Sequence, residues 1–119
     1  MKKIKHLILP ILATIVVVIG SGLSAARAKV LMPETLLSQD KFLHLSCYFI
    51  LTFLWAYGLH RLDVNKAINK SLWITIIVGI IMELCQFLFF EGRLFEILDI
   101  IANISGSLIG ALVFIKFIK

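Results

Sequence analysis

Acidic, basic and amide side chains interrupt the long apolar stretches of this sequence, and they are of the types that bind polar ligands or transfer protons. Asp40, His44 and Tyr48 follow one another at intervals of four residues, with Lys41 beside them. At about 100° per helical residue, this spacing places the three side chains in one stripe along a helix. Such a stripe could bind a ligand or relay protons. Taken singly, Asp40 could instead cap a helix and Lys41 could reach lipid headgroups.

Glu83 and Gln86 lie three residues apart inside a later apolar run, which places both on one face of a helix. Glu83 is about seven residues, or ~10 Å, from the end of that run. A carboxylate at this depth must be protonated, paired or hydrated, because desolvation destabilises its charged form. Arg93 follows in a short connection, and its planar guanidinium suits a carboxylate or a phosphate. We therefore expect a site here, with a purely structural interhelical bond as the alternative.

Asp99, Asn103, Gly106 and Gly110 form a third group within the last apolar run. Their angular positions fall within about 60° of one another, so the four residues share one stripe of a helix. The Gly-x-x-x-Gly spacing lets a second helix approach closely, which is a packing device in most membrane proteins. Asp99 alone could be an acid that favours the helix N-terminus. Asn103, one turn deeper, needs a partner inside the bundle.

The composition shows which elements must position these residues. Hydrophobic residues make up 61% of the 119 residues and charged residues 16%, against ~45–50% and ~25% in soluble domains. A soluble domain of this size could not bury so much apolar surface. Four apolar runs can cross a hydrocarbon core of ~30 Å as helices, and they cover residues 7–23, 42–59, 71–90 and 97–118. We expect an all-α polytopic membrane protein, one domain over 1–119 that folds as a four-transmembrane-helix bundle.

Lysine and arginine residues predict the orientation of this bundle, because cytoplasmic flanks are enriched in them. One side of the membrane receives Lys2, Lys3, Lys5, Arg61, Lys66, Lys70, Lys116 and Lys119, and the other receives Arg27, Lys29, Lys41 and Arg93. Both termini are therefore expected in the cytoplasm. The net charge of +5 reflects this anchoring rather than a surface for nucleic acid. The first run also resembles a cleavable signal peptide, an alternative that leaves the other spans in the same orientation.

In this topology the second span begins, the third ends and the fourth begins on the outer side. The polar residues therefore fall in the outer half of the membrane, and the sequence offers nothing comparable in the inner half. We expect one polar cluster that opens toward the extracytoplasmic face. Its candidate ligand-binding residues are Asp40, Lys41, His44, Tyr48, Glu83, Gln86, Arg93, Asp99 and Asn103.

These residues resemble the motifs of the VanZ-like family of small bacterial membrane proteins. The resemblance covers about residues 40–110 and rests on Asp40-Lys41-x-x-His44-x-x-x-Tyr48, on Glu83-x-x-Gln86, and on Arg93 followed by Asp99-x-x-x-Asn103-x-x-Gly106-x-x-x-Gly110. The family takes its name from an accessory protein of glycopeptide resistance associated with teicoplanin. The resemblance implies a multi-pass protein of the bacterial plasma membrane with a role in the cell envelope.

One functional hypothesis is a binding or accessory protein whose outward site engages an amphiphilic envelope molecule. A lipid-linked cell-wall precursor or an amphiphilic antibiotic, such as a lipophilic glycopeptide, would fit this description. Arg93 and Lys41 would meet its anionic groups, while His44, Gln86 and Asn103 would supply hydrogen bonds.

The alternative hypothesis is a membrane-embedded enzyme. Glu83, His44 and Asp99 are candidate catalytic residues for acid–base chemistry on a lipid-linked phosphate or acyl group. No recognisable nucleophile motif accompanies them, and Ser46 and Cys47 are candidates by proximity alone. The sequence therefore does not decide whether the protein is an enzyme. A proton-coupled carrier is a third hypothesis. The polar residues extend only halfway across the membrane, so they do not form a complete proton path, and this weighs against a carrier.

The sequence predicts neither a cofactor nor a metal site, because no pair of candidate ligands has the H-x-x-x-H or C-x-x-C spacing. Cys47 and Cys85 lie at similar depths in consecutive spans. We expect them to behave as small apolar residues rather than as a disulfide. These residues leave the oligomeric state open.

Overall fold

The computed structural model describes the backbone of residues 4–28, 34–89 and 97–118, and the side chains of residues 4–20, 42–88 and 97–118. A short 3-10 helix, η1 (Ile4–Leu7), leads into the long helix α1 (Ile8–Ala28). Three more long helices follow, α2 (Glu34–Arg61), α3 (Ala67–Phe89) and α4 (Ile97–Phe117). Every regular element in these ranges is helical, so the all-α fold class is confirmed.

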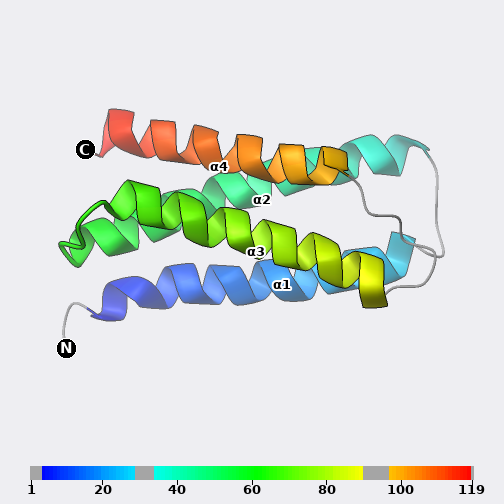
Figure 1. The fold of residues 1–119 in the computed structure, drawn as a ribbon, viewed down its shortest axis with the longest axis horizontal. Helices are drawn as coiled ribbons and strands as arrows, with labels where there is room; N and C mark the ends of the chain where they lie inside the picture. Colours follow the sequence, from blue (N-terminus) through cyan, green and yellow to red (C-terminus); the bar gives the residue numbers. More distant parts are fainter. Residues whose placement is uncertain (1–3, 29–33, 90–96, 119) are drawn as a thin grey trace.

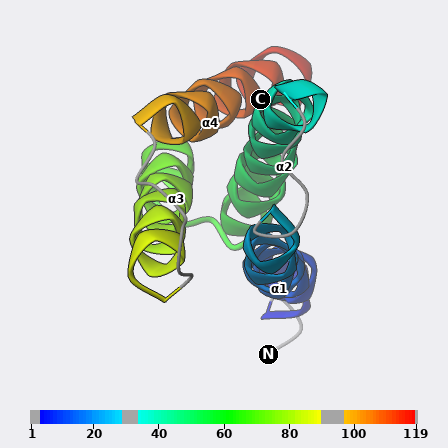
Figure 2. The same cartoon turned by 90° about the vertical axis from the view of Figure 1, so that its right-hand side faces the viewer.

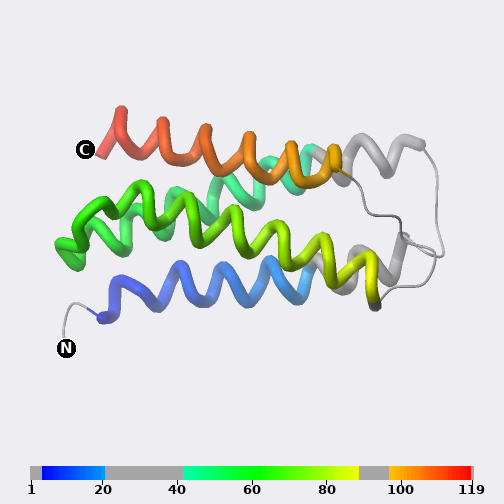
Figure 3. Tube along the Cα trace, viewed as in Figure 1, coloured from blue at the N-terminus to red at the C-terminus, as the bar shows by residue number. Residues whose placement is uncertain are grey.

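The four long helices run up and down (Figure 1). The chain trace reverses direction at each connection, so that α2 and α4 run parallel to each other and antiparallel to α3 (Figure 3). The start of α1 and the end of α4 therefore lie at the same end of the bundle. The molecule is 44 Å long, close to the ~40–45 Å thickness of a bilayer with its headgroups.

The helix α4 shows which solvent surrounds the bundle. Its buried residues are small or polar with one aromatic exception, namely Asp99, Asn103, Gly106, Ser107, Gly110, Ala111 and Phe114. Large aliphatic side chains lie on the outside, and Ile101 is 52% and Leu112 64% exposed. A water-soluble helix has the opposite pattern. This inverted distribution suits a helix whose outer surface faces lipid.

Three segments are long and apolar enough to span a membrane, namely Phe42–Arg61, Ala67–Leu88 and Ile97–Phe117. They match the predicted spans 42–59, 71–90 and 97–118 to within a few residues. The described part of the first apolar segment, Ile4–Gly20, is shorter. Three of the four predicted spans are thus supported by the length and composition of the helices, and the first stays a prediction.

The tightest packing joins α2 and α4, which are not consecutive in the chain. A Cβ atom added at Gly106 would collide with the backbone carbonyl of Leu45, and one added at Gly110 would collide with that of Phe49. The Gly-x-x-x-Gly stripe therefore places the backbone of α4 directly against that of α2, the packing role expected for this motif. The consecutive helices α3 and α4 are also neighbours.

Helix α1 packs on the side of α2 and α3 and, within the described residues, makes no contact with α4 (Figure 2). Gly58 of α2 permits this approach, because a Cβ atom there would lie 2.7 Å from the carbonyl oxygen of His6. Nearby, the indole N–H of Trp55 donates to Oγ1 of Thr14 at 3.0 Å. Helix α1 is therefore joined to α2 by backbone packing and by a hydrogen bond.

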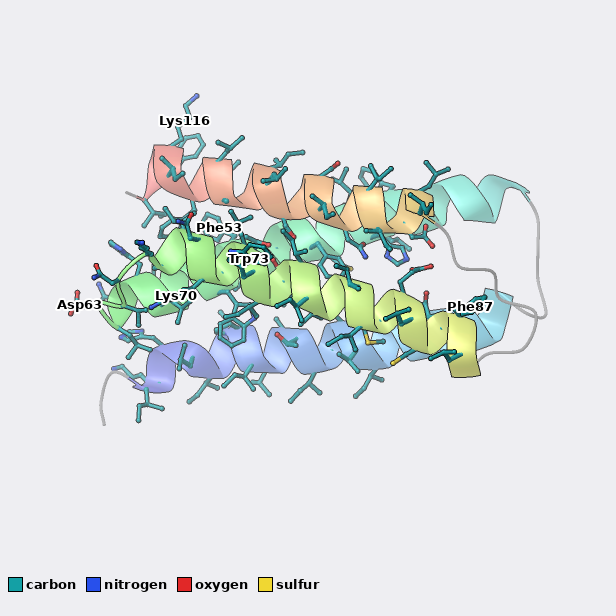
Figure 4. All side chains as sticks on the ribbon, viewed as in Figure 1. Phe53, Asp63, Lys70, Trp73, Phe87 and Lys116 are labelled. Atoms are coloured by element: carbon teal, nitrogen blue, oxygen red, sulfur yellow. The ribbon has the colours of Figure 1, made fainter. Side chains whose placement is uncertain are left out.

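The turn between α2 and α3 defines the end of the bundle where α1 starts and α4 ends. Asp63 and Lys66 adopt positive φ angles of 58° and 54° there, a conformation uncommon for residues other than glycine. Asp63, Lys70 and Lys116 lie at this end, whereas Phe87 lies toward the opposite end (Figure 4). The lysine and arginine side chains that the structure describes therefore lie at the end of the α2–α3 turn.

Candidate functional site

Helix α2 contributes a histidine and a tyrosine near the end opposite the α2–α3 turn. His44 is half-buried, and Tyr48, one turn further along, has only 1% of its surface exposed. A Cβ atom added at Gly79 of α3 would lie 3.3 Å from Cε1 of Tyr48. The stripe predicted for His44 and Tyr48 therefore faces the other helices rather than lipid.

His44 forms a hydrogen bond with Asn103 of α4, with 2.9 Å between Nδ1 and Oδ1. Because the amide oxygen can only accept, the N–H at Nδ1 of His44 is the donor. In the neutral ring the lone pair then lies on Nε2. This bond joins two residues that are 59 positions apart in the chain, and it orients the imidazole.

Helix α3 contributes Glu83 and Gln86, each with 1% of its surface exposed. Both side chains therefore point into the bundle, as their three-residue spacing predicts. Gly79, one turn before Glu83, brings α3 close to α4, because a Cβ atom at this position would lie 3.1 Å from Nδ2 of Asn103. The face of α3 that carries Glu83 is thus the face packed against the other two helices.

Helix α4 contributes Asp99 and Asn103, which are 0% and 2% exposed. An aspartate turned toward lipid at the centre of a span costs about 2.5–3.5 kcal/mol on insertion scales, and such residues accordingly face the bundle interior. The buried carboxylates Glu83 and Asp99 both have interaction partners. Helices α3 and α4 thus each bring one acid and one amide to the interior of the bundle.

Six of the predicted site residues therefore gather near one end of the bundle, on the helices α2, α3 and α4. We call them the polar cluster, and its members are His44, Tyr48, Glu83, Gln86, Asp99 and Asn103. In the described part of the chain, the buried polar or charged side chains are about as numerous as the buried apolar ones. The interior is therefore about as polar as it is apolar, unlike a soluble core.

A model of the VanZ/LLP1 family matches residues 6–119, which is nearly the whole chain. The chain belongs to the VanZ/LLP1 family. The family membership predicted from residues 40–110 is thus confirmed, and the VanZ/LLP1 match also includes the first helix. No match is found among curated proteins or among solved structures.

Three predicted site residues of this VanZ/LLP1 chain lie outside the described residues. They are Arg93 and the side chains of Asp40 and Lys41. The pairing of Glu83 with Arg93 therefore stays a prediction, as do the contacts of Lys41 and Arg93 with anionic groups of a ligand.

Buried hydroxyl groups extend the polar interior beyond the polar cluster, toward the α2–α3 turn. Ser71, Thr75, Thr52 and Ser107 are all fully buried, and Ser71 and Thr75 lie in the half of α3 nearer the α2–α3 turn. These side chains are hydroxyls, so the expectation that the inner half holds no comparable acids, amides or histidine stays a prediction. The four-residue spacing of Ser71 and Thr75, on the same broad face as Glu83, was the signal for this extension in the sequence.

The polar cluster of this VanZ/LLP1 protein offers several kinds of chemistry. Two carboxyl groups and an oriented imidazole can exchange protons, and two amides can each donate and accept hydrogen bonds. Within the described residues, no group of three or more His, Cys, Asp and Glu side chains could hold a metal ion. Cys47 and Cys85 are both free thiols in half-buried positions.

Proposed function

We propose that this VanZ/LLP1 protein is a multi-pass protein of the bacterial plasma membrane that binds an amphiphilic envelope molecule in its polar cluster. The ligand class is a lipid-linked cell-wall precursor or a lipophilic glycopeptide antibiotic of the teicoplanin type. The observation that carries this proposal is the convergence of Glu83, Gln86, Asp99 and Asn103, all buried, beside His44 at one end of the bundle. Buried ionisable groups in membrane helices are costly and generally mark functional sites.

The proposed topology has four spans with both termini in the cytoplasm. All lysine and arginine side chains that the structure describes support this orientation, because they lie at the end of the α2–α3 turn: Lys5, Arg61, Lys66, Lys70 and Lys116. The positive-inside rule assigns that end to the cytoplasm. The polar cluster, near the opposite end, then faces the extracytoplasmic side, where envelope precursors and glycopeptides are found.

The retention of α1 as the fourth span has two supports. Helix α1 packs against α2 through Gly58 and through the bond between Trp55 and Thr14. The family match also begins at residue 6 and so includes this helix. We therefore favour a membrane-spanning α1 over a cleaved signal peptide.

The chemistry of the cluster suits a ligand with a polar headgroup and an apolar tail. The amides of Gln86 and Asn103 and the carboxyl groups of Glu83 and Asp99 can bond to hydroxyl, amide or amine groups of a sugar or peptide headgroup. The apolar outer surface of the helices would meet the lipid tail. Arg93 and Lys41 remain the proposed partners of phosphate or carboxylate groups.

The substitution Glu83→Gln tests the proposed function, with Asp63→Asn as the matched control. Both replace an acid by its amide, and Asp63 lies in the α2–α3 turn at the opposite end of the bundle. The binding probes are labelled teicoplanin and a lipid-linked peptidoglycan precursor, each titrated into the purified protein in lipid nanodiscs. We expect Glu83→Gln to weaken binding at least about tenfold, because a hydrogen bond to a charged group contributes about 1.5–3 kcal/mol.

The control Asp63→Asn should bind as the wild type does. Membrane insertion of each variant is checked by its yield in the membrane fraction. Wild-type protein that binds neither probe, or Glu83→Gln protein that inserts and binds both probes with wild-type affinity, would contradict the proposed function.

One observation favours an enzymatic role as a second candidate. The bond from His44 to Asn103 holds an imidazole in a fixed orientation, which a general base requires. In this case His44→Gln would abolish the release of phosphate or acyl product from a lipid-linked substrate while substrate binding persists. Wild-type protein that binds such a substrate without turnover would argue for the binding role alone.

A further inference from the structure

Three hydroxyl groups from three different helices lie close together between the polar cluster and the α2–α3 turn. The Oγ1 atoms of Thr52 in α2 and Thr75 in α3 are 2.8 Å apart, and Oγ of Ser107 in α4 is 3.1 Å from the same Thr75 oxygen. All three side chains are 0% exposed. We call these residues the hydroxyl clamp. Thr75 lies at its centre, because it bonds to both of the others.

The hydroxyl of Thr75 has four partners in this arrangement. Its Oγ1 also lies 3.0 Å from the carbonyl oxygen of Ser71 and 3.2 Å from that of Leu72, both in its own helix. A hydroxyl has one proton to donate and two lone pairs that accept. Thr75 can therefore accept the proton of Thr52, while its own proton is shared between Oγ of Ser107 and the two carbonyl oxygens of its own helix. Loss of this one hydroxyl would remove a partner from α2 and from α4 at once.

Along each helix, the clamp residue lies one or two turns from a residue of the polar cluster. Thr75 precedes Glu83 by eight residues, Thr52 follows His44 by eight, and Ser107 follows Asn103 by four. At 1.5 Å per residue these intervals are about 12 Å and 6 Å. Gly79 lies between the two layers on α3, where its missing side chain leaves room for Asn103 and Tyr48. The clamp therefore supports the same helix faces that carry the polar cluster.

We propose that Thr75 is a positioning residue whose hydroxyl sets the rotation and height of α3 against α2 and α4. A slip of α3 by one residue would move its side chains by about 1.5 Å and turn them by about 100°. Such a slip would break both interhelical bonds of Thr75 and turn Glu83 and Gln86 away from the cluster. The role of this placement in ligand binding rests on the proposed function, whereas the placement itself can be measured without a ligand.

Cys85 reports the placement of α3, because it precedes Gln86 directly and is half-buried. The protein has two cysteines, so Cys47→Ser leaves Cys85 as the single thiol. In this background we compare Thr75→Val, which replaces the hydroxyl by a methyl group, with Thr75→Ser, which retains the hydroxyl. The readout is the alkylation rate of Cys85 by a membrane-permeant maleimide in nanodiscs. Thr75→Val should change this rate by about threefold or more, the factor that one average interhelical hydrogen bond represents.

Two comparisons separate positioning from a general loss of stability. Thr75→Ser should restore the wild-type rate, and Thr14→Val should leave it unchanged, because Thr14 joins α1 to α2 and does not contact the clamp. If Thr75→Val does not insert, Ser107→Ala removes one bond of the clamp with a smaller change and should also alter the rate. An unchanged rate in the inserted Thr75→Val or Ser107→Ala protein overturns the proposal, as does an equal change in Thr75→Ser.

Binding of teicoplanin or of the lipid-linked precursor gives a second, independent readout. If Thr75→Val alters Cys85 reactivity and weakens binding, both proposals are supported. If it alters Cys85 reactivity in a protein that binds neither probe, the positioning role stands and the proposed function fails. If the wild type binds a probe and the inserted Thr75→Val protein shows unchanged Cys85 reactivity, the proposed function stands and the positioning role fails.

Discussion

At the scale of single residues, the bond between His44 and Asn103 links two of the three helices that carry the predicted motifs. Asn103 is 2% exposed and accepts the proton of Nδ1 from a half-buried ring. An interhelical bond between polar groups in membrane proteins contributes about 0.6 kcal/mol on average and up to about 1.7 kcal/mol. The contribution of this bond to stability is therefore modest, and its main effect is to orient the imidazole.

A double-mutant cycle with His44→Ala and Asn103→Ala measures this bond. We expect a coupling energy of about 0.6–1.7 kcal/mol in the free energy of unfolding, because each single substitution removes the same interaction. The measurement is denaturant unfolding of the purified protein in mixed micelles. A cycle of Asn103→Ala with Thr14→Val serves as the control and should be additive. Additive effects in the His44 cycle would mean that the bond does not contribute to stability.

At the scale of the helices, the two glycines of α4 decide how the bundle packs. Gly106 and Gly110 allow the backbone of α4 to lie against the carbonyls of Leu45 and Phe49 in α2. This close approach brings Asn103, which lies on the same stripe, within hydrogen-bonding distance of His44. The Gly-x-x-x-Gly motif therefore packs α4 against α2, and this packing brings the polar residues of the two helices together.

Substitution of two glycines by alanine tests this packing, because the two changes should affect the free energy of unfolding in opposite directions. Gly106→Ala should lower the free energy of unfolding by about 1–3 kcal/mol, because overpacking a close contact costs that much. Gly20→Ala should instead leave it unchanged or raise it by up to about 1 kcal/mol, since alanine is the better helix former. Among the described residues, nothing beyond its own helix backbone and its chain neighbours lies within 4 Å of a Cβ added at Gly20, so it is the matched control. Equal responses in the same unfolding assay would contradict the α2–α4 packing.

The helix scale also shows how far the sequence could predict the site. The stripes of α3 and α4 followed from spacing, because residues three or four positions apart share a helix face. Glu83 and Asn103 accordingly point into the bundle. The hydroxyl clamp could not be predicted from the sequence, because serine and threonine also occur in apolar helices without an interhelical partner. The pairing of α2 with α4 was not predictable either, since a short connection predicts only that consecutive helices are neighbours.

At the scale of the whole molecule, polar groups form an interior column and apolar groups form the outer surface. The column runs along the interface of α2, α3 and α4, from Asp99 and Glu83 through Asn103 and the hydroxyl clamp to Ser71. Phe114, 0% exposed and packed edge-on against Phe53 and His60, fills the interior beyond it. A buried aromatic ring therefore follows the polar groups toward the α2–α3 turn.

The orientation of this column in the membrane decides which molecules can reach the polar cluster. Labelling of introduced thiols measures that orientation.

In a background with Cys47→Ser and Cys85→Ser, we expect Lys66→Cys in the α2–α3 turn to react with a membrane-impermeant maleimide only after cells are opened. Gly92→Cys, in the connection between α3 and α4, should react in intact cells. The reason is the positive-inside rule, because the lysine and arginine side chains that the structure describes lie at the α2–α3 end. The unsubstituted background is the control and should remain unlabelled. The reverse pattern would place the polar cluster on the cytoplasmic side, and an extracytoplasmic glycopeptide could then not be its ligand.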